Sequence, residues 1–363
     1  MDAMRSVLAV AVAFAHAWYL LIEDYRGQVS VLASSAYFLA GYAHASVILF
    51  FVLSGFWIAR SVDRRVATGW RWSSYLIDRL ARLLVVLVPA LAIGGALDAV
   101  ALYGLESSTH IGATDTYVLR RNVGDALGWR VLLGNLLFLQ DIAVAPLGTN
   151  GPLWSLAYEF WFYIWFPAII LSWRARRPSP FLLATGLAWI APHMVIGFGC
   201  WLCGAALYRA TRERNGEDRR APLGRGWLGA AATALMAMLV IVRVVGLTDL
   251  ELPLAATFAL FLFTLLRVDP VPPRWLRPLA AYGARASFSL YALHFPVIAF
   301  AAALLLDTGR LPPSAANIVL VAATLASVLF VCSVFARYTE RNTGRVRSFL
   351  SSTNPVARAN RPE

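Results

Sequence analysis

Long apolar stretches recur along almost the whole chain, and they restrict it to a fold that crosses a lipid bilayer many times. A membrane-spanning helix needs about 20 mostly apolar residues. We predict ten spans, of which the fifth and sixth are short and poorly separated: 6–22, 38–59, 83–103, 152–173, 179–193, 195–209, 227–246, 252–267, 286–306 and 315–336. The predicted fold is therefore all-α, a polytopic integral membrane protein with about ten transmembrane helices.

The composition leaves no room for a separate soluble domain. Of the 363 residues, 59% are hydrophobic and only 14% are charged, whereas about a quarter of the residues of a soluble domain are charged. We expect residues 1–344 to form a single transmembrane domain. Residues 345–363 are polar and predict a loosely ordered cytoplasmic tail.

The positive charge lies between the apolar stretches. The net charge is +12, and all of the basic residues other than histidine are arginines. Loops rich in arginine remain in the cytoplasm, and an even number of spans with a cytoplasmic N-terminus places most of these groups there. Both termini are then cytoplasmic. Because the arginines follow this pattern, we interpret the basic charge as topology and predict no nucleic-acid partner.

Residues 104–151 fit this pattern less well. They carry Arg120, Arg121 and Arg130 but fall on the outer side. The apolar part, 131–148, is interrupted by glycine and proline. We therefore expect an outer loop with a re-entrant or interfacial segment, because non-helical backbone at membrane depth is tolerated where it lines a protein cavity.

Several ionisable side chains lie inside predicted spans, where they are costly and mark functional sites. His16 follows Arg5 by eleven residues, roughly 16 Å along a helix and about half the hydrocarbon thickness. His294 lies at a similar depth, one turn after Tyr291, and Glu159 enters from the opposite side. Two histidines and a carboxylate can transfer protons; a hydrogen-bonded plug that joins helices is the alternative.

Arg79 and Arg82 are three residues apart on the helix that begins near residue 73. They either anchor the helix at the cytoplasmic surface or bind an anionic ligand, because guanidinium groups pair with phosphates in a bidentate manner. Ser54 and Gly55 are small residues in a bulky span and allow close approach of a helix or ligand. The sequence contains no zinc or phosphate-loop motif, and we predict no metal site.

Five segments, in this order, resemble the acyltransferase-3 family of membrane-bound acyltransferases, which includes O-antigen and exopolysaccharide O-acetylases. The resemblance covers essentially the whole chain. The segments are "DAMRSVLAVAVAFAH", "VILFFVLSGFWIAR", "YLIDRLARLLVVLVP", "GPLWSLAYEFWFYIWFP" and "SFSLYALHFPV".

Individual residues match the family's motifs. Arg5 and His16 match its Arg-x10-His signature. Arg79 and Arg82 match the later positions of Phe-x-x-Arg-Arg-x-x-Arg, with Tyr75 in the aromatic position. Asp78 replaces the first arginine of that pair, and this departure weakens the expectation of a three-arginine clamp. The remaining matches are Trp154, Ser155 and Glu159 to Trp-Ser-x-x-x-Glu, and Tyr291 and His294 to Ser-Leu-Tyr-x-x-His.

The resemblance implies transfer of an acyl group, usually acetyl from cytoplasmic acetyl-CoA, to a hydroxyl of a glycan or lipid-linked glycan in the bacterial inner membrane. We expect His16, Glu159 and His294 to be catalytic, with His16 as general base or acyl carrier. We expect Arg5, Arg79 and Arg82 to bind the donor. Trp154, Ser155 and Tyr291 are expected at the acceptor, with Tyr291, Ser155 or an arginine as oxyanion donor. Membrane lipids and polysaccharide-assembly proteins are the expected partners.

Three alternatives remain open at this stage. A macrolide-type secondary metabolite or a membrane lipid is a second class of acceptor. A proton-coupled transporter of a lipid-linked sugar or small solute would also carry histidines at the membrane midplane, although the sequence shows no internal repeat. A scaffold with buried polar contacts would need His16 and Glu159 for folding alone.

Overall fold

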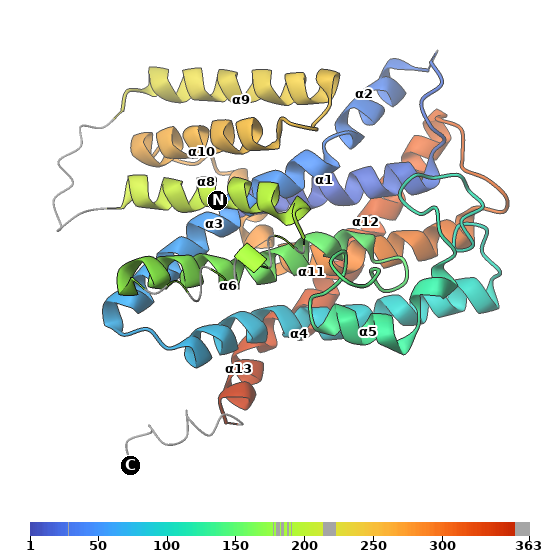
Figure 1. Ribbon diagram of the computed structural model, residues 1–363. Helices are drawn as coiled ribbons and strands as arrows, with labels where there is room; N and C mark the ends of the chain where they lie inside the picture. Colours follow the sequence, from blue (N-terminus) through green and yellow to red (C-terminus); the bar gives the residue numbers. More distant parts are fainter. Residues whose placement is uncertain are drawn as a thin grey trace. The chain divides into compact units, whose positions relative to one another are not determined.

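The computed structural model shows a helical protein (Figure 1). It describes residues 1–27, 29–176, 191–212 and 223–352, together with Pro178, Leu182, Thr185, Gly186 and Trp189. Within these ranges there is no β-strand apart from two isolated bridges.

Nine helical segments of the described chain are long and apolar enough to cross a membrane: Asp2–Leu21, Ala43–Thr68, Trp72–Gly104, Gly151–Ala175, Met194–Thr211, Arg225–Val245, Glu251–Val268, Leu276–Leu305 and Ala315–Ser352. The protein is therefore an all-α, multi-pass membrane protein, as predicted. Eight of the fifteen residues of the fifth predicted span, 179–193, lie outside the described residues.

The chain divides into two compact units, each of which is described by itself. Unit 1 comprises Met1, His44–Trp70 and Tyr158–Arg277, and unit 2 comprises Asp2–Ala43, Arg71–Ala157 and Pro278–Glu363. Helices α6 and α11 each contribute to both units.

Unit 1 is built from parallel and antiparallel long helices. In Figure 1, α10 lies between α8 and α9 and packs against both. The helices of this unit are α3 (Ala43–Thr68), α6 from Tyr158 onward (Trp154–Ala175 in full), α8 (His193–Thr211), α9 (Arg225–Val245) and α10 (Glu251–Val268).

Two glycines bring the backbones of α3 and α8 into contact. A Cβ atom on Gly55 would lie 2.0 Å from the carbonyl oxygen of Trp201, and one on Gly204 would lie 1.9 Å from that of Val52. Both separations are far below contact distance, so any side chain at either position would force the helices apart. The close approach expected at Ser54 and Gly55 is thus one between helices.

Unit 2 contains the remaining long helices. In this unit α1 packs against α2 and α12, and α13 packs against α4. Its main helices are α1 (Asp2–Leu21), α2 (Val31–Ala40), α4 (Trp72–Ala99), α11 (Leu276–Leu305), α12 (Ala315–Tyr338) and α13 (Thr343–Ser352). Helix α13 corrects the prediction of a loose tail from residue 345, since the tail is helical as far as Ser352.

Helices α1 and α11 run side by side in the same direction. Near their first turns, Ser6 donates a hydrogen bond to the carbonyl of Leu279, and a Cβ atom on Gly283 would lie 2.0 Å from the carbonyl oxygen of Asp2. Ten or eleven residues later, about 15–16 Å along each helix, His16 meets His294. The glycine contact therefore sets the register that brings the two histidines together.

Arg310 fixes the other end of α1. Its guanidinium binds both carboxylate oxygens of Asp24 at 2.8 Å and donates to the carbonyl of Ile22 at 3.0 Å. This hydrogen bond and charge hold the pKa of the Asp24 carboxyl below its usual value. The loop after α11 is also joined to the end of α1 by backbone hydrogen bonds between Leu311 and both Leu21 and Glu23.

Residues 105–150 form loops and short helices, of which the longest is α5 (Trp129–Leu136). A buried polar cluster fixes this segment to α4. Asp98 accepts hydrogen bonds from the backbone N–H and hydroxyl of Thr149, both at 2.8 Å, and from Nε2 of His110 at 3.3 Å. Because each polar group has a partner, the cluster can be buried without a large desolvation penalty.

Candidate active site

Two histidines form the centre of the candidate site in unit 2. Nδ1 of His16 lies 2.8 Å from Nε2 of His294, and the two rings are inclined by only 14°. Phe295 closes one side, with its ring nearly perpendicular to that of His16 and the two centroids 4.9 Å apart. His294 is 1% exposed and His16 is half-buried, so the pair lies largely within the helical bundle of this unit.

The hydrogen bonds of His294 determine which nitrogens carry protons. Its Nδ1 lies 2.9 Å from the carbonyl oxygens of both Leu290 and Tyr291. A carbonyl oxygen only accepts, so Nδ1 of His294 must carry the hydrogen. In the neutral imidazole Nε2 then has a lone pair and accepts from the Nδ1–H of His16. This assignment leaves Nε2 of His16 unprotonated, and no described residue hydrogen-bonds to it.

The arrangement gives His16 the properties of a base held in one orientation. When Nε2 of His16 takes a proton, the ring becomes an imidazolium whose Nδ1–H is already donated to His294. His294 therefore fixes the tautomer of His16 in the way that an orienting group does in other acid–base pairs.

Pro296 disturbs α11 immediately after this histidine. Proline lacks an N–H, so the carbonyl of Ala292, four residues earlier, has no helical partner. Asn150 compensates for the loss: its side-chain Nδ2 donates to the carbonyl oxygen of Ala292 at 2.9 Å. Gly94 of α4 faces the proline ring, because a Cβ atom there would lie 3.0 Å from Cγ of Pro296. Asn150 thus stabilises the interrupted helix two residues from His294.

Ser155 and Tyr291 join the first turn of α6 to α11. The hydroxyl of Tyr291 donates to the carbonyl of Pro152 at 2.8 Å, and the hydroxyls of Ser155 and Tyr291 hydrogen-bond to each other. With its hydrogen committed to Pro152, Tyr291 accepts from Ser155. The two hydroxyls therefore hold the first turn of α6 against α11. Trp154 lies half-buried at the start of α6.

Glu159 lies in unit 1, in a small cluster of hydroxyl groups. Its Oε1 accepts hydrogen bonds from Ser54 and Tyr163, both at 2.5 Å, and Ser54 in turn accepts from the indole N–H of Trp201 at 3.3 Å. Two hydroxyl donors explain how the apolar segment 151–167 accommodates an acid. The histidine pair belongs to unit 2.

Two of the three candidate donor-binding arginines belong to one electrostatic group in unit 2. Arg5 and Arg82 both lie close enough to act on the carboxylate of Glu340, which accepts a hydrogen bond from the backbone N–H of Ser289 at 2.9 Å. Arg79 lies over the ring of Tyr75, with its guanidinium carbon 5.6 Å from the centroid.

Asp78, which departs from the family pattern, has an ion-pair partner of its own. Its carboxylate lies 2.6 Å from Nε of Arg347 in α13. The acid therefore helps to attach α13 to α4.

Among the described residues, no group of three or more His, Cys, Asp or Glu side chains is placed to hold a metal ion. A model of the acyltransferase-3 family, described as an acyltransferase domain, matches residues 1–337. The chain belongs to the acyltransferase-3 family. No curated protein and no solved structure matches this acyltransferase.

The sequence alone selected both histidines of this acyltransferase but missed their supporting residues. Asn150 lies in a loop and has no periodic signal of its own. Pro296 was a usable signal, since a proline inside a helix predicts a carbonyl at residue 292 in need of a donor. Tyr163 could also have been found, because it lies four residues after Glu159 on one helix face.

Proposed function

We propose that this membrane acyltransferase moves an acetyl group from acetyl-CoA to a hydroxyl group of a glycan or lipid-linked glycan. The observation that carries the proposal is the unprotonated Nε2 of His16, held in place by a hydrogen bond from Nδ1 to His294. A base fixed inside a helical membrane bundle is suited to remove a proton from an alcohol away from bulk water.

The proposed reaction uses His16 twice. Nε2 of His16 accepts the proton of the acceptor hydroxyl as the oxygen attacks the thioester carbonyl. When the tetrahedral intermediate collapses, the carbon–sulfur bond breaks, and the same nitrogen returns its proton to the departing thiolate. His294 stabilises the imidazolium between these two steps by keeping its Nε2 lone pair on the Nδ1–H of His16. A second form of the mechanism makes Nε2 of His16 a transient acyl carrier.

The other candidate residues take roles that follow from their surroundings. We assign Arg5, Arg79 and Arg82 to the phosphates of the donor, because guanidinium groups pair well with phosphate oxygens. Glu159 is assigned as the catalytic carboxylate, held in place by hydrogen bonds from Ser54 and Tyr163.

We assign Trp154, Ser155 and Tyr291 to the acceptor. The ring of Trp154 provides a flat surface for a sugar. Ser155 and Tyr291 supply hydroxyls beside α11, and either could stabilise an oxyanion after exchanging its present hydrogen bond.

The proposed setting is the bacterial inner membrane, with both termini in the cytoplasm, where the arginine-rich loops would meet the donor. Residues 1–344 would act as one transmembrane domain, assisted by polysaccharide-assembly proteins that present the acceptor. A surface polysaccharide is the acceptor class that we place first.

The test compares purified wild type with His16→Ala in lipid nanodiscs, using radiolabelled acetyl-CoA. The proposal predicts slow hydrolysis of the donor by wild type, and loss of that turnover in a variant with the same thermal unfolding temperature. A protein that neither binds nor hydrolyses acetyl-CoA would contradict the donor assignment and favour a transporter. In cells, a deletion strain should lose acetyl groups from its surface glycan and regain them only with the wild-type gene.

A further inference from the structure

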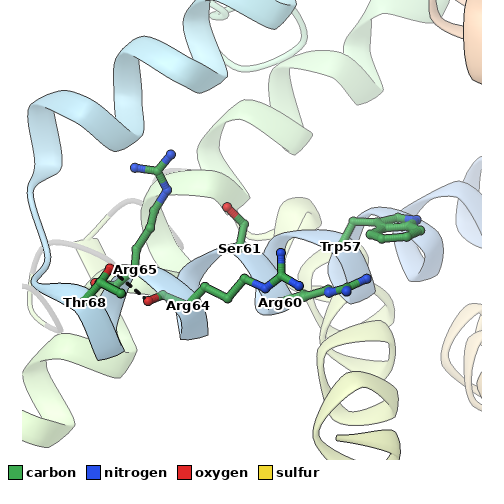
Figure 2. A pocket seen from close by; sticks show the side chains of 6 residues that line it. All are labelled: Trp57, Arg60, Ser61, Arg64, Arg65 and Thr68. Atoms are coloured by element: carbon green, nitrogen blue, oxygen red, sulfur yellow. Dashed lines mark hydrogen bonds between the residues drawn. The ribbon is translucent and has the colours of Figure 1, made fainter.

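A pocket rich in arginine lies on the C-terminal half of α3 in unit 1. Its volume is about 600 Å³, and its lining residues are Trp57, Arg60, Ser61, Arg64, Arg65 and Thr68. They recur three or four residues apart, so they form one continuous stripe on the helix. Figure 2 shows Arg60 and Arg64 along one edge of the stripe and Ser61 and Arg65 along the other. We call this feature the α3 pocket.

The α3 pocket has a large positive charge. Three of its six lining residues are arginines and none is acidic. Arg60 and Arg64 are four residues apart on the helix, a spacing at which like charges repel each other. Asp63 lies among them in sequence, but its carboxylate accepts from Arg212 at 2.7 Å and from Tyr208 at 2.9 Å. The nearest acid along the helix therefore has its charge paired with a residue of α8's C-terminal end.

Other groups in the α3 pocket are also suited to an anionic ligand. The indole Nε1–H of Trp57 is buried and has no hydrogen-bond partner in the described part of the chain. The guanidinium carbon of Arg60 lies 5.6 Å from the centroid of the Trp57 ring, which holds this arginine at one end of the pocket. The hydroxyl of Ser61 lines the middle of the pocket. The site thus offers guanidinium and hydroxyl donors to one occupant.

We infer that the α3 pocket binds a phosphate-bearing anion. Phosphate oxygens match the paired N–H groups of arginine, and the pocket volume lies within the range of about 300–1,000 Å³ found for small-molecule sites. Two sources share this chemistry: a soluble nucleotide that carries phosphates and the headgroup of an anionic phospholipid. Neither source rests on the proposed function, which assigns the phosphates of the donor to Arg5, Arg79 and Arg82 in unit 2.

The test measures binding rather than acyl transfer, so it is independent of whether the protein proves to use acetyl-CoA. Wild type and an Arg60→Gln/Arg64→Gln variant are placed in nanodiscs of neutral phosphatidylcholine and titrated with adenosine 3′,5′-bisphosphate. Thermal unfolding of the same samples is followed with and without phosphatidylglycerol. Arg225→Gln is the control, because Arg225 is exposed at the start of α9, and Arg60→Lys/Arg64→Lys keeps the charge without the bidentate geometry.

If the ligand is a nucleotide, the double glutamine variant should bind the bisphosphate about tenfold or more weakly than wild type. The lysine variant should lose less affinity, and the affinity of the Arg225→Gln control should change by less than about twofold. The headgroup source predicts no binding of the soluble bisphosphate, together with a stabilisation by phosphatidylglycerol that the double variant loses. The inference is overturned if neither ligand distinguishes the double variant from wild type. If the glutamine variant does not fold, the lysine variant and wild type make the same comparison.

Discussion

The contact between Asn150 and the interrupted helix α11 gives a prediction that a double-mutant cycle can isolate. In wild type, the carbonyl of Ala292 accepts from Nδ2 of Asn150 at 2.9 Å, since Pro296 cannot supply the usual helical N–H. Asn150→Ala would leave a buried carbonyl without a partner. Pro296→Ala would restore an N–H that can reach the same carbonyl.

The expected magnitude follows from the hydrogen bond that is lost. An unpartnered buried acceptor costs about 1–3 kcal/mol. Part of this cost is offset because Oδ1 of Asn150 is itself buried without a partner in the described structure, and its removal relieves that penalty. We therefore expect Asn150→Ala to lower the free energy of unfolding by about 1–2 kcal/mol in the wild-type background, and by less than about 0.5 kcal/mol with Pro296→Ala.

The assay is reversible unfolding of the four proteins in mixed micelles, followed by tryptophan fluorescence. The cycle cancels the small void that asparagine removal leaves, because that void is common to both backgrounds. An equal destabilisation by Asn150→Ala with and without Pro296 would refute the assignment. Acyl transfer should also fall in Asn150→Ala, because the carbonyl lies two residues from His294 in α11.

Three further predictions concern packing, the buried carboxylate and pH. Gly55→Ala should prevent normal folding, because the added methyl group would overlap a carbonyl of the adjacent helix. Gly229→Ala is the matched control: a Cβ atom there has nothing within 4 Å, so the substitution should stabilise α9 by about 0.5–1 kcal/mol. The yield of folded protein and the thermal unfolding temperature measure both effects. Tyr163→Phe should lower the free energy of unfolding by about 1–3 kcal/mol because Glu159 loses one of two hydroxyl donors, and an unchanged unfolding midpoint would contradict this. The hydrogen bond from Arg310 lowers the pKa of the Asp24 carboxyl in the folded protein. The ionised carboxylate therefore stabilises the fold above about pH 4, and this stabilisation is lost as the pH falls through the folded-state pKa. The difference in unfolding temperature between wild type and Asp24→Asn should shrink at acidic pH.

The hydrophobicity and length of the apolar stretches were sufficient to predict the helical membrane fold. Apolar stretches of about 20 residues have few other stable forms in a bilayer, and each of the nine candidate spans of the described chain overlaps a single predicted one. Five of them agree to within four residues at both ends, whereas 43–68, 72–104, 276–305 and 315–352 extend nine or more residues beyond the predicted span at one end. The prediction failed at residues 345–352, because α13 is stabilised by contacts such as Arg347 to Asp78. A pairing between residues so far apart has no local signal.

Residues of the candidate site could be predicted only where an ionisable side chain lies in an apolar segment, because burying such a group is costly. His16, Glu159 and His294 are ionisable groups in apolar segments and could be chosen on that basis. Most of the supporting residues could not, since Asn150 and Gly283 are common residue types whose importance comes from contacts made in the folded protein. Ser54 was selected only as a small residue that allows close approach, and its hydrogen bond to Glu159 had no signal in the sequence. The orientation of His16 likewise depends on the two carbonyls that face Nδ1 of His294, and a sequence does not display these.

The most direct test of the catalytic assignment is the acetyl-transfer rate of His16→Asn. The amide of asparagine can replace the Nδ1–H donor to His294, so the helix contact is retained, but no group remains at the position of Nε2. We predict unfolding behaviour close to that of wild type with a loss of about 10²–10⁴-fold in the transfer rate. A folded His16→Asn protein that transfers acetyl groups at the wild-type rate would contradict the assignment of this nitrogen as the base.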